Sequence, residues 1–229
     1  DTPPLTVQVN PLKTDAESLI KELEGWGVTA KPHPWVPGCL ELTGAGDLTT
    51  LAPFREGKLL VQDPAARLVS LIAGVQPGQK VLDLCAAPGG KSLLLIEEMG
   101  DQGRLVSCDV SENRVQLIRK AVERMGFAHV EPRVSDGTKP DVLREEGLPE
   151  ADALVTLTES DETNLIISSF AYHEQVPKIV TKVDEDNFIE LAESYGLTTI
   201  IQPADVTAGR IVEYVRWMQN SAHSSGVET

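Results

Sequence analysis

Apolar residues recur along the chain in short blocks with two alternating periods. Blocks with strand character lie at 81–84, 104–110, 130–134, 153–158, 178–183 and 198–201. Stretches with helical spacing of apolar residues follow them, and the clearest carries Val115, Ile118, Val122 and Met125 on one face. Strands that alternate with helices in this way predict an α/β fold, namely a doubly wound, Rossmann-like parallel sheet with helices on both faces.

A different pattern precedes this alternation. Residues 5–9 alternate as a strand, residues 14–17 have the capping-box pattern that opens a helix, and short strands are expected at 40–42 and 58–61. We therefore expect a small α/β appendage over 1–62, a Rossmann-like domain over 63–220, and a small, polar, disordered tail over 221–229.

Charge and cysteine content narrow the class of partner. The chain has a net charge of −15, and residues 151–229 hold only 4 of the 20 Lys/Arg but 13 of the 35 Asp/Glu. Such a surface repels phosphate backbones, which argues against RNA as a partner. The three cysteines, Cys39, Cys85 and Cys108, lack metal-ligand spacing and are expected to be reduced thiols of a cytoplasmic protein. We expect no metal site, and no apolar run is long enough to suggest a membrane span.

The stretch 81–92 is the most informative one. A buried-strand block is followed by Cys85, Ala86, Ala87, Pro88, Gly89, Gly90 and Lys91, a small-residue turn that opens a helix. Adjacent glycines let the backbone approach a ligand at the helix N-terminus. The run Asp-Leu-Cys-Ala-Ala-Pro-Gly-Gly-Lys resembles the S-adenosylmethionine loop of the RsmB/NSUN-type RNA (cytosine-5) methyltransferases. The resemblance covers residues 1 to about 145 and implies an RRM-like appendage and a cofactor site at Cys85–Lys91.

Two acidic residues extend this candidate site. Asp109 ends the second strand of the sheet, where a carboxylate can accept hydrogen bonds from ribose hydroxyls. Asp136 follows the third strand, and the resemblance implies that it contacts the adenine end of the cofactor. The alternative for Asp136 is a simple turn residue.

The catalytic part of the methyltransferase pattern is missing. The family uses two cysteines in later strands, one of which attacks C6 of cytosine as a thiolate. In this chain the corresponding stretch places Leu157 at a cofactor aspartate and Ser160 at the nucleophile, and no cysteine follows Cys108. We therefore predict no catalytic residues.

Residues 151–219 resemble a second family, the TrkA/RCK NAD-binding regulatory domains of potassium transporters. The resemblance is carried by Ala-Leu-Val-Thr-Leu-Thr at 153–158, by Asp-Glu-Thr-Asn-Leu at 161–165 and by Lys-Ile-Val-Thr-Lys-Val at 178–183. It implies that Thr156, Thr158, Glu159 and Lys182 lie near a nucleotide cleft, although exposed polar residues at strand ends are a common alternative. The Gly-x-Gly-x-x-Gly loop of that family is absent.

Together the two resemblances suggest a recombined chain, either an engineered chimera or a natural fusion, with halves at 63–147 and 148–220. The sheet order would be 3-2-1-4-5-6, all parallel. Three functions follow: a S-adenosylmethionine-binding chimera without turnover, which we favour; an active rRNA cytosine-5 methyltransferase; or an NAD-binding regulatory module. The partner would be a small nucleotide-like ligand, bound weakly, and the protein would be a monomer or a homodimer through a helix at 204–219.

Overall fold

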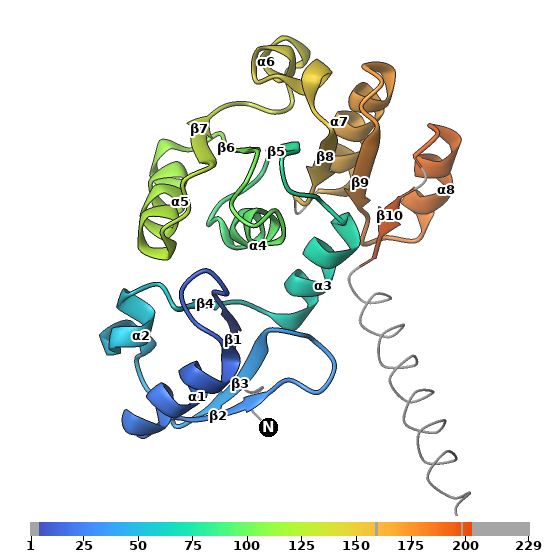
Figure 1. Cartoon of the computed structure of the whole chain (residues 1–229). Helices are drawn as coiled ribbons and strands as arrows, with labels where there is room; N and C mark the ends of the chain where they lie inside the picture. Colours follow the sequence, from blue (N-terminus) through green and yellow to red (C-terminus); the bar gives the residue numbers. More distant parts are fainter. Residues whose placement is uncertain (1–4, 159, 198, 203–229) are drawn as a thin grey trace, which may run out of the picture.

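The computed structural model describes residues 5–158, 160–197 and 199–202 (Figure 1). The predicted helix at 204–219, the dimer that depends on it, the tail at 221–229 and Glu159 lie outside these residues. The described chain forms two sheets, one of four strands from the first 61 residues and one of six strands from residues 80–201.

The N-terminal sheet has the order β2-β3-β1-β4 and is antiparallel in its three pairings. Its elements are β1 (Leu5–Val9), α1 (Ala16–Gly25), β2 (Thr29–Pro32), β3 (Cys39–Thr43), a 3₁₀ turn, α2 (Ala52–Arg55) and β4 (Leu59–Val61). Helix α1 is capped by Asp15, whose side chain accepts a hydrogen bond from the backbone N of Ser18. The predicted capping box, which starts at Thr14, is therefore one residue early.

The larger sheet confirms the predicted α/β architecture. Its elements after α3 (Pro64–Ala73) are β5 (Lys80–Asp83), α4 (Gly90–Glu98), β6 (Arg104–Asp109), α5 (Glu112–Met125), β7 (Val130–Val134), α6 (Pro140–Glu145), a 3₁₀ turn, β8 (Ala153–Thr156), α7 (Asp161–His173), β9 (Lys178–Lys182), α8 (Asn187–Ser194) and β10 (Ile200–Ile201). The order β7-β6-β5-β8-β9-β10 is the predicted 3-2-1-4-5-6, and every pairing is parallel.

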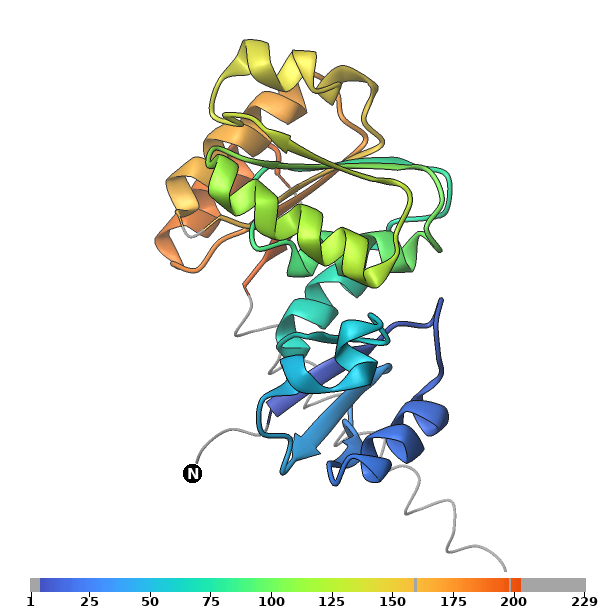
Figure 2. The ribbon, with the colours of Figure 1, turned by 90° about the vertical axis from the view of Figure 1, so that its left-hand side faces the viewer.

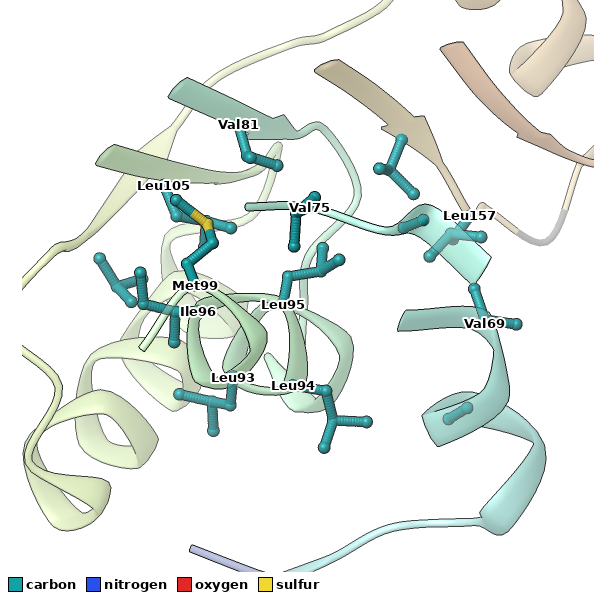
Figure 3. Packing of buried hydrophobic residues seen from close by; sticks show 14 of the residues in the cluster. Val69, Val75, Val81, Leu93, Leu94, Leu95, Ile96, Met99, Leu105 and Leu157 are labelled. Atoms are coloured by element: carbon teal, nitrogen blue, oxygen red, sulfur yellow. The ribbon is translucent and has the colours of Figure 1, made fainter. Parts of the chain in front are cut away.

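Helices cover both faces of this sheet (Figures 1 and 2). On one face α3, α4 and α5 pack over alternate strand residues, and α4 with its C-cap residue Met99 buries Leu93, Leu94, Leu95, Ile96 and Met99 (Figure 3). On the other face α6 and α7 pack over Leu82, Val106 and Leu154. Because neighbouring residues of a strand point to opposite faces, the uninterrupted apolar runs in the sequence serve both layers.

The two halves of the sheet meet where β5 pairs with β8. Val81, Leu82 and Asp83 lie opposite Ala153, Leu154 and Val155, and these six residues are at most 2% exposed. This pairing brings the carboxyl ends of β5 and β8 to the same edge of the sheet, where a crevice forms in open α/β folds.

The N-terminal sheet packs against the end of α5. The Asn10 side chain donates to the backbone oxygens of Gly57 and Met125, and Arg124 Nη1 donates to those of Phe54 and Leu59. The backbones approach so closely that a Cβ on Gly57 would lie 1.9 Å from the Arg124 oxygen. The appendage is thus held to the Rossmann-like domain by hydrogen bonds from side chains to backbone oxygens and by close backbone packing at Gly57.

Candidate functional site

The loop after β5 is built by small residues that make tight backbone contacts. The backbone N of Ala86 donates to the oxygen of Cys108 at 2.9 Å, and the N of Gly89 donates to the oxygen of Ala86 at 2.6 Å. Gly89 has φ +105°, a backbone conformation that residues other than glycine rarely adopt. Because of this turn, the N-terminus of α4 lies at the edge of the sheet where the strands have their carboxyl ends.

The buried carboxylate of Asp83 holds this loop through hydrogen bonds. Asp83 is 1% exposed, accepts a hydrogen bond of 2.6 Å from Ser92 Oγ and a longer one from the backbone N of Cys85, and its pKa is raised by burial. Ser107 Oγ donates in turn to Ser92 Oγ at 2.9 Å. The chain of hydrogen bonds fixes β5, β6 and α4 relative to one another.

Asp109 and Asp136 lie at the ends of the next two strands. Asp109 Oδ1 accepts from the backbone N of Ser111 at 3.0 Å, and Asp109 Oδ2 lies 4.0 Å from Arg114. Asp136 accepts from the hydroxyl and the backbone N of Thr138, which lower its pKa. Both carboxylates therefore remain acceptors for ligand hydroxyl or amino groups.

These elements enclose a cavity of about 420 Å³. Of the nine predicted site residues, eight line it: Cys85, Ala86, Ala87, Pro88, Gly90, Lys91, Asp109 and Asp136. Gly89 is the exception, and a Cβ placed on it would lie 3.4 Å from Ile118 of α5. Sequence reasoning missed Gln62, Val110, Arg114 and Thr138, which also line the cavity.

The second half of the chain supplies one wall. Leu157 and Thr158 line the cavity, as expected for Thr158. Asn164 is fully buried; its side chain accepts from the backbone N of Thr158 and donates to the oxygens of Thr158 and Lys182. Asn164 thereby ties the ends of β8 and β9 together.

Three other residues of this half lie away from the cavity lining. Thr156 is 1% exposed and hydrogen-bonds Ser168, so its predicted place near the cleft is wrong. Lys182 contacts Asp184 and the oxygen of Thr158. Ser160, at the position of the methyltransferase nucleophile, is the N-cap of α7 and accepts from the backbone N of Thr163.

None of the three thiols has the environment of a nucleophile. Burial raises the pKa of Cys39 to about 11 and those of Cys85 and Cys108 to about 12. The described residues hold no cluster of His, Cys, Asp or Glu that could bind a metal ion. Within the same residues, no helix is long and apolar enough to cross a membrane.

Comparison with known families finds matches to two parts of the chain. Residues 1–49 match the RsmF/B-like methyltransferase ferredoxin-like domain, and residues 89–203, half of the chain, match the TrkA-N domain. The chain belongs to the TrkA-N domain family. Its TrkA-N match begins at Gly89, in the loop before α4, and so extends further toward the N-terminus than the resemblance seen from residue 151 onward. The predicted combination of an RsmB/NSUN-type first half with a TrkA-N region is confirmed.

Curated relatives of this TrkA-N protein include RNA methyltransferases. A probable ribosomal RNA small subunit methyltransferase B of Synechocystis is 36% identical over 141 residues, 61% of the chain and 32% of the relative. The 25S rRNA (cytosine-C(5))-methyltransferase NSUN5 of Arabidopsis thaliana is 33% identical over 56% of the chain and 22% of its own length. The chain thus spans a third or less of the length of these relatives.

Solved structures agree with the fold. The crystal structure of PH0851 superposes with a TM-score of 0.66 at 27% identity, covering 96% of this chain and 51% of that one. A methyltransferase homologue from Pyrococcus horikoshii has a TM-score of 0.64 at 23% identity over 78% of this chain and 62% of its own, which shows the fold alone.

Proposed function

We propose that the protein binds S-adenosylmethionine in the cavity at the carboxyl ends of β5, β6, β7 and β8. The observation that carries this proposal is convergence: the loop 85–91, Asp109 and Asp136, separated by up to 51 positions in sequence, line one cavity of about 420 Å³. That volume lies within the range of small-ligand pockets. Asp109 would accept hydrogen bonds from the ribose hydroxyls of the cofactor, and Asp136 would face its adenine end.

The loop favours this ligand over a dinucleotide. A dinucleotide fingerprint places glycines where the backbone must approach the pyrophosphate, whereas this loop has Cys85 and the Ala-Ala pair in the first positions. NAD binding remains the second candidate because the TrkA-N match includes residues of the same cavity.

We further propose that the bound cofactor is not used for cytosine methylation. The reaction of the resembled family needs a thiolate, and the three cysteines have pKa values raised to about 11 or 12. Ser160 caps a helix, and a serine hydroxyl is far less acidic than a thiol. A SAM-dependent rRNA cytosine-5 methyltransferase activity is the alternative.

The junction of β5 with β8 supports an origin by recombination, with 1–62 as a separate appendage.

Calorimetric titration tests the proposal. We expect saturable binding of S-adenosylmethionine to the wild type, weaker binding of NADH, and loss of affinity in Asp109→Ala. Asp101→Ala is a matched control, because Asp101 accepts hydrogen bonds from residues 128 and 129 and is not part of the cavity lining. Tighter binding of NADH than of S-adenosylmethionine would favour the regulatory alternative.

A methyl-transfer assay separates binding from turnover. Incubation with labelled S-adenosylmethionine and unmodified rRNA should give no labelled RNA above a no-enzyme control. Labelled 5-methylcytosine in the product would refute the absence of turnover and leave the binding site intact.

A further inference from the structure

Gln62 reaches the cofactor cavity from outside the Rossmann-like domain. It directly follows β4 and is held to β1 by two hydrogen bonds: its backbone N donates to the Thr6 oxygen at 3.3 Å, and Thr6 Oγ1 donates to the Gln62 oxygen at 3.0 Å. Its backbone thus belongs to the N-terminal sheet, while its side chain lines a cavity otherwise built by the larger one.

The Gln62 side chain lies directly against the first turn of α4. A Cβ placed on Gly90 would lie 1.9 Å from Gln62 Oε1 and 3.1 Å from Gln62 Cδ. Glycine at position 90 therefore provides the space in which the amide lies. Among the described residues, no hydrogen bond to a protein partner occupies this side-chain amide.

Gln62 also separates two cavities. A second cavity of about 420 Å³ lies between the N-terminal sheet and α4, and it shares Gln62, Pro88 and Gly90 with the first. The lining of the second cavity is mainly apolar, with Leu5, Leu48 and Phe54 among its residues. The amide of Gln62 stands at the boundary of the two, with its polar atoms beside the N-terminus of a helix.

We propose that Gln62 is a specificity-determining residue of the nucleotide cavity: its amide hydrogen-bonds the bound ligand beside Gly90 and closes the cavity toward the N-terminal sheet. This inference rests on the proposed function. An amide has both donors and acceptors and can bind a polar ligand of either charge sign. The N-terminal sheet then contributes directly to ligand selection, beyond packing on α5.

Four variants test the role by calorimetry with S-adenosylmethionine and NADH. Gln62→Ala should lower the affinity for S-adenosylmethionine about five- to tenfold, which is the effect of losing one net hydrogen bond. Gln62→Glu adds a negative charge to the cavity. It should therefore keep the affinity for the cationic S-adenosylmethionine and lower the affinity for the anionic NADH. Gly90→Ala should displace the amide and weaken binding as much as Gln62→Ala does. Since both changes remove the same contact, the double variant should bind no worse than either single variant.

The matched control is Gln76→Ala, an exposed glutamine in the turn before β5, at the opposite end of that strand. It should bind like the wild type, and all variants should keep the wild-type melting temperature. Wild-type affinity in Gln62→Ala would overturn the role of Gln62 while leaving the proposed function in place. Additive losses in the double variant would show that Gly90 affects the ligand independently of Gln62 and would overturn the inference that Gly90 acts by making space for the amide. No binding to the wild-type protein would overturn both proposals.

Discussion

Glu97 should make the stability of the protein depend on pH in an unusual direction. Its carboxylate on α4 is 6% exposed and lies 2.8 Å from Arg67 of α3, while Glu98 holds the same guanidinium at 2.7 Å. Burial raises the pKa of Glu97 from 4.5 to about 7, against the attraction of Arg67, and Glu98 adds to the rise. The folded state thus favours the protonated acid.

The sign follows from proton linkage. Between pH 4.5 and 7 the folded chain holds more protons than the unfolded chain, so this contribution to stability is complete below pH 4.5 and is lost as the pH rises through about 7. At about 1.4 kcal/mol per pKa unit, the loss between pH 5 and pH 8 amounts to about 2 to 3 kcal/mol. Glu97→Gln, which keeps the shape without the titration, should remove it.

Urea denaturation at pH 5, 6, 7 and 8 measures this difference. The free energy of unfolding of the wild type should fall relative to that of Glu97→Gln as the pH rises. Glu98→Gln, which removes the smaller contribution of the neighbouring carboxylate, should reduce the slope without abolishing it, because burial is the largest cause of the raised Glu97 pKa. Parallel curves for the wild type and Glu97→Gln, or a wild type that gains stability with pH, would refute the reasoning, since the ion pair would then outweigh burial.

Three further predictions concern other parts of the fold. Asn164→Ala should lower the free energy of unfolding by about 1 to 3 kcal/mol in urea titration, because it removes the hydrogen bonds of a fully buried amide to part-buried backbone groups of Thr158 and Lys182; a loss under 0.5 kcal/mol would contradict this. Arg124→Ala should speed amide hydrogen exchange in β4 selectively, because Arg124 binds the oxygens of Phe54 and Leu59; unchanged exchange there would count against the contact. The native thiols should react with iodoacetamide at pH 8 far more slowly than the unfolded chain, given pKa values of about 11 or 12; rapid labelling of Cys85 would disprove this.

Much of the fold follows from local patterns. Apolar blocks set the six strands, and the carboxyl ends of parallel strands share an edge, so the strand end alone predicts Asp109 beside the loop 85–91. Asp136 is predicted there only from the resemblance to the methyltransferases. Residues 140–145, by contrast, form α6 although the sequence there has no clear helical period. The N-cap of α1 differs by one residue because Asp15 competes with Thr14 for the role.

Side-chain direction and long-range contacts limited the prediction of the site. Thr156 and Thr158 have the same residue type near one strand end, yet only Thr158 reaches the cavity, because Thr156 hydrogen-bonds Ser168 within the layer of α7. Gln62 enters from a separate sheet, and nothing local to residue 62 shows how that sheet docks on α5. Such contacts depend on tertiary packing, so a single sequence does not encode them in a readable pattern.

Residues from both halves of the chain are proposed to line one S-adenosylmethionine-binding cavity, and a crystal structure with this ligand tests the proposal most directly. We predict electron density for the ligand between the loop 85–91 and the end of β8, within hydrogen-bonding distance of Asp109 and Asp136. The ligand bound elsewhere, or NADH in that cavity under conditions where S-adenosylmethionine is not seen, would contradict the account.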